Sequence, residues 1–100
     1  MDELFKKELK NAMDSYEKIL EVTKAIESNL EIMGMDYDVQ FGVEDKIIFK
    51  FIRNGVEVST HRIQYGPFKI LDTELLVDLI TDGFIADLVP WKELIKSLQP

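Results

Sequence analysis

Apolar and polar positions in the first third of the chain recur with the period of an α-helix. From Asp2 to about Met33 there is no Gly or Pro, and side chains of one stripe return every three or four positions. The stripe consists of Leu9, Ala12, Tyr16, Ile19, Thr23, Ile26, Leu30 and Met33, and is widened by Met13 and Leu20. Asp2 and Glu3 favour a helix start and Gly34 favours a helix end, so the pattern predicts one helix of about 45–50 Å.

The pattern then changes to the two-residue period of β-strands. Tyr37, Val39, Phe41 and Val43 alternate with polar residues or Gly. Two further apolar segments, 47–53 and 56–63, flank Asn54-Gly55, which favours a type I′ hairpin turn because both central residues take positive φ. These segments predict a three-stranded antiparallel meander.

The loop lengths predict how these strands pair. A two-residue loop at Asn54-Gly55 pairs Arg53 with Val56, Phe51 with Val58 and Phe49 with Thr60. A three-residue loop from Glu44 to Lys46 pairs Val43 with Ile47, Phe41 with Phe49 and Val39 with Phe51, and gathers the aromatic side chains on one face. The core face then includes Ile47, Phe49, Phe51, Val56 and Val58. The open face is expected to consist of Asp38, Gln40, Gly42, Ile48, Lys50, Ile52, Glu57, Ser59, His61 and Ile63.

The last third of the chain predicts a turn and two helices. Tyr65-Gly66-Pro67 is the expected turn, and Asp72 is the expected N-cap of a helix that carries Leu75, Leu76, Leu79 and Ile80 and ends near Asp82-Gly83. Residues 84–89 stay open between a loop and a short helical turn. Pro90 suits the first position of a final helix with Trp91, Leu94, Ile95 and Leu98 on one face. The predicted fold is a single α+β domain over residues 1–100, in the order α-β-β-β-α-α.

The charge of the chain narrows the choice of partners. Nineteen acidic residues against twelve Lys and Arg give a formal net charge of −7, spread over both helical ends and not gathered in a tail. Such a surface repels nucleic acid and anionic lipid, and it attracts a basic protein. There is no cysteine, and the N-terminus is charged from its second residue and lacks the apolar core of a signal peptide. A cytoplasmic protein is therefore expected.

Candidate chemistry is sparse. The five glycines stand apart from one another and form no phosphate-binding loop, and His61 is expected to be an exposed strand residue on the open face. Asp36 with Asp38, and Asp78 with Asp82, are spaced to share a face, and we interpret both pairs as surface charge. We therefore expect no catalytic residue, no metal site and no cofactor, and so a protein that is not an enzyme.

The first helix is longer than the predicted strands, which span about 23 Å. One half of its stripe is expected to pack on the sheet of the same chain, and the overhanging half either to do the same or to form a homodimer with a second copy. Trp91, at helical spacing with Leu94, Ile95 and Leu98, is expected to be a core residue.

The α-β-β-β-α-α order with an acidic surface resembles in architecture some phage-encoded inhibitors of CRISPR nucleases, which occupy basic nucleic-acid sites on their targets. The resemblance implies that Asp14, Glu17, Glu21, Asp36 and Asp38 take the place of phosphates in binding a basic protein. The leading hypothesis is therefore a small acidic, non-enzymatic interaction module, acting as an inhibitor or accessory subunit of a nucleic-acid-handling protein, for example as a phage anti-defence protein.

Three alternatives stay open. The first is a structural homodimer. The second is a nucleic-acid-binding domain, because α-β-β-β-α also resembles the double-stranded-RNA-binding fold; the helix that follows Asp72, however, carries Glu74, Asp78 and Asp82 where that fold has a basic patch. The third is a small enzyme with a pocket between the first helix and the C-terminal helices.

Overall fold

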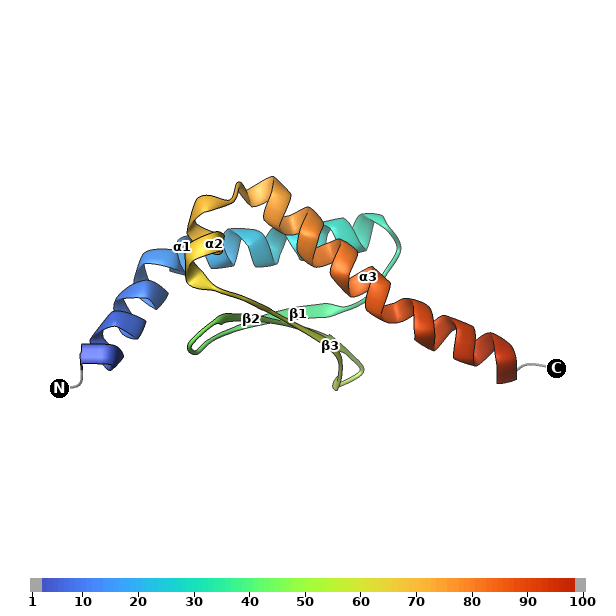
Figure 1. The fold of residues 1–100 in the computed structure, drawn as a ribbon. Coiled ribbons are helices and arrows are strands. Elements are labelled where there is room, and N and C mark those ends of the chain that lie inside the picture. The colour runs from blue at the N-terminus through green and yellow to red at the C-terminus, as the bar shows by residue number, and fades with distance from the viewer. Residues whose placement is uncertain (1–2, 99–100) are drawn as a thin grey trace.

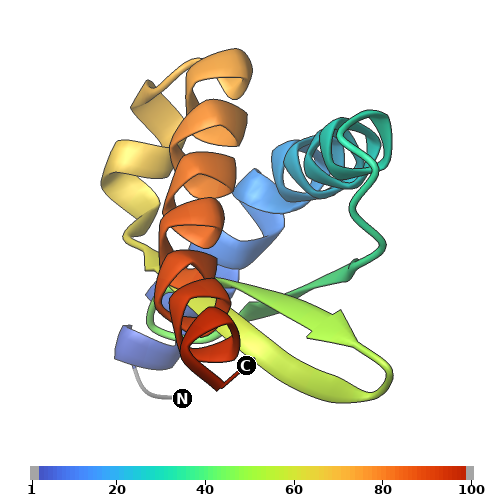
Figure 2. The ribbon, with the colours of Figure 1, turned by 90° about the vertical axis from the view of Figure 1, so that its right-hand side faces the viewer.

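The computed structural model describes the backbone of residues 3–98, and the side chains in that range except those of residues 4, 5, 8, 9, 11, 12 and 89–97. The elements follow the order α1 (Glu3–Ile32), β1 (Asp38–Val43), β2 (Ile47–Arg53), β3 (Val56–Ile63), α2 (Tyr65–Ile70) and α3 (Thr73–Leu98). This confirms an α+β fold with a three-stranded antiparallel sheet, ordered β1-β2-β3. All three helices lie on one face of the sheet (Figure 1; Figure 2).

The end of α1 is set by Gly34. Its φ is +76°, its N–H donates to the Glu31 carbonyl at 3.0 Å, and the next N–H, of Met35, donates to the Leu30 carbonyl at 2.8 Å. This pair of bonds is a Schellman motif, which satisfies carbonyls that the last helical turn leaves without partners. The predicted stop at Gly34 is therefore confirmed.

The core forms between the helices and the sheet. From α1 it takes Ile19, Val22, Ile26 and Leu30, from the sheet Val39, Ile47, Phe49 and Phe51, and from the C-terminal part Tyr65, Phe68, Leu76, Val77, Ile80, Phe84 and Leu88. The predicted stripe of α1 is thus buried from Ile19 to Leu30, whereas Met13, Tyr16 and Met33 stay largely exposed. Leu9 and Ala12 belong to the side chains that are not described. The structure extends 60 × 26 × 21 Å because both long helices continue past the sheet (Figure 1).

The first hairpin forms as predicted. Val43 pairs with Ile47, Phe41 with Phe49 and Val39 with Phe51, and the Glu44 N–H donates to the Lys46 carbonyl at 3.0 Å across the three-residue loop. The second hairpin turns at Asn54 and Gly55, whose φ angles are +53° and +76°. This is the backbone conformation that a type I′ turn needs.

The predicted register of the second hairpin is wrong beyond Glu57. Arg53 pairs with Val56 and Ile52 with Glu57, but Phe51 then pairs with Ser59 and Phe49 with His61. Val58 is the extra residue of a β-bulge, and a one-residue shift turns every later side chain to the opposite face.

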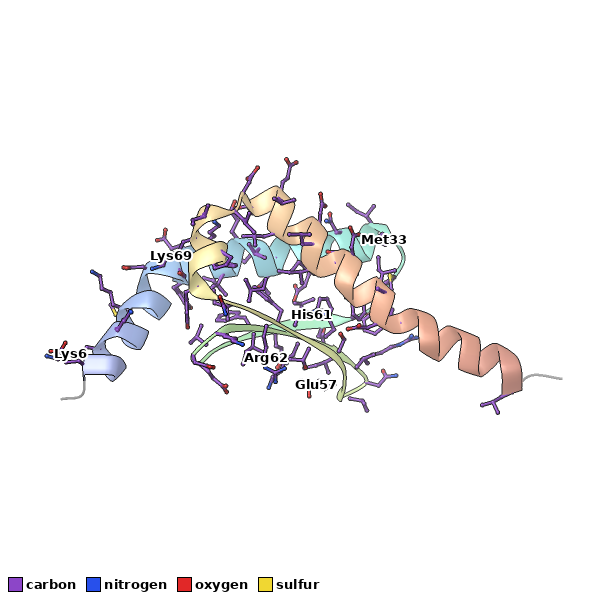
Figure 3. The ribbon with its side chains drawn as sticks, viewed as in Figure 1. Lys6, Met33, Glu57, His61, Arg62 and Lys69 are labelled. Atoms are coloured by element: carbon purple, nitrogen blue, oxygen red, sulfur yellow. The ribbon has the colours of Figure 1, made fainter. Side chains whose placement is uncertain are left out.

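The shift changes which residues face the core. Ser59, His61 and Ile63, expected on the open face, turn toward the helices, while Glu57 and Arg62 project from the far side of the sheet (Figure 3). Val56, expected in the core, is mostly exposed. Ile48 lies on the outer face as expected but is buried there.

The predicted turn at residues 65–67 is a short helix, α2. Pro67 occupies its first turn, where a backbone N–H would have no intrahelical acceptor, so Pro does not interrupt it. Phe68 enters the core, and Leu71 takes an extended conformation that ends the helix. Lys18 of α1 donates to the carbonyls of Phe68 at 2.6 Å and of Leu71 at 2.5 Å, and so satisfies this end of α2.

The predicted break between two C-terminal helices is also wrong. The helix begins at Thr73, next to the expected N-cap Asp72, but it continues through Gly83 and Pro90 to Leu98. Ile80, Phe84 and Leu88 recur every four residues and are buried against the sheet. Their burial outweighs the cost of about 1 kcal/mol that Gly adds inside a helix. The expected core position of Trp91, Leu94 and Ile95 concerns side chains outside the described set.

Candidate functional site

His61 lies between the sheet and α3 and is not the exposed residue that its sequence position predicted (Figure 3). Its side chain is 22% exposed, and its Nε2 is 3.0 Å from Ser59 Oγ and 3.2 Å from Asp87 Oδ2. Ser59 Oγ donates to the same Asp87 oxygen at 2.7 Å. Because this bond uses the only hydroxyl proton, Ser59 accepts from a protonated Nε2. The three side chains therefore form a closed polar triangle that joins β3 to α3.

This triangle contains the residue types of a hydrolytic triad but not its geometry. In a triad the serine and the acid contact opposite nitrogens of the imidazole, so that one nitrogen takes the serine proton while the other is held by the carboxylate. Here both oxygens contact Nε2, and the serine proton points to the carboxylate. In this arrangement the Ser59 hydroxyl donates to Asp87 and not to the imidazole, and the contacts join α3 to the sheet.

Gly83 provides the space for His61. A Cβ atom at this position would lie 3.0 Å from Cε1 of the imidazole, closer than ordinary van der Waals contact. On its other side the imidazole meets Phe51 edge-on at 5.8 Å between centroids, and Phe51 stacks on Phe84 at 4.1 Å. Tyr37 adds a second edge contact to Phe84, at 4.9 Å. Glycine inside α3 is thus explained by close packing on the sheet.

The sequence-predicted partner-binding residues are all exposed, but the structure divides them into separate groups. Asp14, Glu17 and Glu21 follow the outer side of α1. Asp36 lies in the connection after α1, and Asp38 begins β1. Asp36 and Asp38 share one cleft and also line a smaller hollow that includes Arg53, Glu21 lines a second cleft, and neither of the two clefts includes Asp14 or Glu17.

The first cleft, which we call the α1–β1 cleft, is lined by Glu27, Glu31, Gly34, Met35, Asp36, Tyr37 and Asp38 and has a volume of about 390 Å³. Every charged residue that lines it is acidic. One oxygen of Glu27 accepts from the Val39 N–H at 3.3 Å, so this carboxylate also satisfies the edge of the sheet.

Glu31 occupies an unfavourable position for the fold. It lies in the last turn of α1, which contains no basic residue. The C-terminal end of a helix carries partial negative charge, so a carboxylate there is destabilising by about 0.3–1 kcal/mol. Glu31 also shares its cleft with three other carboxylates. Local stability therefore does not explain the carboxylate at position 31.

The second cleft, the α1–α3 cleft, lies on the opposite flank of α1. It has a volume of about 490 Å³ and is lined by Glu21, Ala25, Asn29, Asp72, Thr73, Glu74, Val77 and Asp78. Its charged residues are again all acidic. Part of the outer surface of α1 thus lies between two clefts that are both negatively charged.

The sheet differs from the helices in its charge balance. Strands and hairpin loops from residue 38 to 63 carry four acids and four bases, namely Asp38, Glu44, Asp45, Glu57, Lys46, Lys50, Arg53 and Arg62. Within the described side chains of α3, residues 73–88, there are four acids, Glu74, Asp78, Asp82 and Asp87, and no Lys or Arg. On α1, Lys18 is engaged with the carbonyls at the end of α2. The excess negative charge therefore lies on the helical layer.

Sequence reasoning missed Glu27, Glu31, Asp72 and Glu74 as members of these clefts. The spacing of Glu27 and Glu31, four residues apart before a helix-ending Gly, was an available signal for two neighbouring carboxylates. For the triangle of Ser59, His61 and Asp87 no such signal existed, because the bulge at Val58 decides which face these strand residues occupy.

The described residues give no indication of a metal site, since no three of their His, Asp and Glu side chains converge as ligands. Between residues 3 and 98, neither long helix combines the length and apolar character needed to cross a membrane. Comparisons with protein-family models, with curated proteins and with solved structures find no match to the chain.

Proposed function

We propose that this chain is a non-enzymatic interaction module that binds a basic protein through the acidic outer surface of α1 and α3. The single observation that carries the proposal is the pair of clefts beside α1, in which every charged lining residue is a carboxylate. Carboxylates at this density attract Lys and Arg side chains, and they accept the paired hydrogen bonds that a guanidinium donates.

The biological role that fits this surface is inhibition or accessory binding in the cytoplasm. A protein that handles nucleic acid carries a basic surface for phosphates, and an array of carboxylates competes for the same surface. Phage anti-defence proteins are one setting in which such competition is useful. In this role Asp36 and Asp38 act together with Glu27 and Glu31, and Glu21 acts with Glu74 and Asp78.

The same charge argues against direct binding of nucleic acid. The formal charge is −7, and the second and third helices place no basic patch opposite a phosphate backbone within the described side chains. Phosphate binding draws its affinity from Lys and Arg that displace counterions. A hydrolase with Ser59 as nucleophile is disfavoured by the geometry of the Ser59–His61–Asp87 triangle, because none of the described side chains places an acid on the second imidazole nitrogen.

The proposal can be tested by affinity capture from a lysate of the source organism, with the retained proteins quantified by mass spectrometry. Three variants carry two charge reversals each at exposed positions: Glu31→Lys with Asp36→Lys in the first cleft, Glu74→Lys with Asp78→Lys in the second, and Glu44→Lys with Asp45→Lys in the β1–β2 loop as the matched control. All three change the net charge equally, so only the location differs.

We expect the wild type and the loop control to retain the same basic protein, and at least one cleft variant to lose it. High salt should weaken the retention by the wild type, because the contacts are between exposed charges. Equal retention by all four proteins, or loss by the loop control alone, would contradict the proposal.

A further inference from the structure

The charge pattern on the outer side of α1 is complementary to the same pattern on a second copy of the chain. Its first turns lead away from the sheet, and Lys6 projects into solvent from them (Figure 3). None of the described side chains from Glu3 to Asp14 is buried. Along the same side, bases come first, at Lys6 and Lys10, and acids follow, at Glu17 and Glu21. All four side chains are exposed.

These residues share one face of the helix. At about 100° per residue, Lys6, Lys10, Glu17 and Glu21 fall within an arc of about 60°. The adjoining arc contains Met13, Tyr16 and Leu20. Met13 is 69% exposed and Tyr16 is 51% exposed, although both are large and substantially apolar. A charged edge therefore runs beside an exposed apolar seam, as it does on the interacting faces of paired helices.

The spacing of these four charges fits a pair of helices related by a two-fold axis. If two copies of α1 pair antiparallel about an axis between Met13 and Asp14, position 6 of one copy lies opposite position 21 of the other, and position 10 lies opposite position 17. Lys6 then meets Glu21 of the second copy, and Lys10 meets Glu17. The symmetry doubles these contacts, so each charge on this edge faces its opposite, and the two Met13 side chains meet at the axis.

We infer that the outer side of α1 is a homodimer interface, in which two chains pair antiparallel through Lys6, Lys10, Met13, Glu17 and Glu21. A two-fold interface uses the same surface patch on both subunits, and this patch is self-complementary in charge as well as in its apolar seam. The Tyr16 ring contacts Phe41 of β1 edge-on, at 6.1 Å between the ring centroids. The second copy covers the exposed parts of Met13 and Tyr16 in the dimer.

The interface leaves the Glu31–Asp36 end of the molecule free. The α1–β1 cleft lies at the C-terminal end of α1, whereas the dimer axis lies in its first half. The α1–β1 cleft and the dimer contact can therefore be altered separately by different substitutions, whereas Glu21 belongs to both the α1–α3 cleft and the dimer contact.

The test is a charge exchange, followed by sedimentation velocity of the purified full chain over a range of concentrations. One variant carries Lys6→Glu and Lys10→Glu, and a second carries Glu17→Lys and Glu21→Lys. Each variant alone places like charges opposite each other in the dimer and should raise the dissociation constant by about tenfold or more. When the two are mixed, every exchanged charge meets its opposite again in the heterodimer.

We expect a concentration-dependent dimer for the wild type, monomers for each variant alone, and recovery of the dimer in the equimolar mixture. Recovery also shows that neither variant is misfolded. A matched control, Glu57→Lys with Asp82→Lys, reverses two exposed acids outside α1 and outside both acidic clefts and should leave the wild-type equilibrium unchanged. A wild type that stays monomeric, variants that dimerise as the wild type does, or a mixture that fails to dimerise would overturn the inference.

Discussion

The two sides of the helical layer differ in what their residues contribute. Toward the sheet, α1 and α3 present fully buried apolar side chains, such as Ile19, Ile26 and Phe84, together with the tightly fitted Gly83. Toward solvent, the same helices present carboxylates that line two clefts. The inner side determines the stability of the fold, because every position there is constrained by contact. On the outer side, Glu27 accepts from the Val39 N–H, whereas Glu31 lies where a carboxylate is unfavourable for the helix.

Glu31 makes this difference concrete. A Lys in the last turn of α1 would complement the helix dipole and reduce repulsion among four carboxylates, yet the chain has Glu there. Departures from local stability of this kind are expected where a surface binds something else. On the inner side the reverse holds, since Gly83 lowers helix propensity but is explained by its contact with His61.

We expect the largest loss of stability from a substitution on the side of the helices that packs on the sheet. Phe84→Ala removes a fully buried ring that stacks on Phe51 and contacts Tyr37. Such a truncation leaves a cavity, and we expect a loss of about 3–5 kcal/mol in the free energy of unfolding, measured by urea denaturation. Ile32→Ala, at a position that is 84% exposed, is the control and should change stability by less than about 0.5 kcal/mol. Similar losses for the two variants would contradict the assignment of the core.

The contact between Gly83 and His61 should give the next largest effect. Gly83→Ala places a methyl group 3.0 Å from the imidazole, so we expect a destabilisation of about 1–3 kcal/mol from overpacking. In a His61→Ala background the same change should be neutral or stabilising by up to about 1 kcal/mol, because Ala favours the helix. A double-mutant cycle measures this coupling. Equal effects of Gly83→Ala in both backgrounds would show that the two residues do not constrain each other.

A smaller effect is expected at Lys18, which links the two sides. Lys18→Met removes the ammonium group that donates to the Phe68 and Leu71 carbonyls, but keeps most of the apolar stem. We expect a loss of about 1 kcal/mol in unfolding free energy, because these carbonyls can turn partly to water. Lys24→Met, at an exposed position of the same helix, should have almost no effect. If both variants unfold like the wild type, Lys18 does not stabilise the end of α2.

The turns and helix ends that short-range signals determine were the most predictable part of the fold. Gly34, the three-residue loop after Val43 and Asn54-Gly55 each depend on local backbone geometry, and all three appear in the structure. The bulge at Val58 has no comparable local signal in the sequence. Gly83 was interpreted as a helix stop for the same reason, since its packing against a strand histidine depends on tertiary structure.

On the outer side, exposure was predictable but grouping was not. Charge and periodicity alone placed Asp14, Glu17, Glu21, Asp36 and Asp38 at the surface, and all five are exposed. Their distribution between two clefts and the outer side of α1 depends on where α3 crosses α1 and where β1 begins. The sequence alone does not show where α3 crosses α1 or how β1 is placed beside the end of α1.

The central claim is that the outer carboxylates other than Glu27 are not required for folding, and the unfolding free energy of Glu31→Lys with Asp36→Lys tests it most directly. Both side chains are exposed, and the exchange complements the dipole of α1 while it removes repulsion within the α1–β1 cleft. The account predicts an unfolding free energy equal to that of the wild type or higher by about 0.5–1 kcal/mol. A decrease of more than about 1 kcal/mol would show that these carboxylates stabilise the fold and would contradict the account.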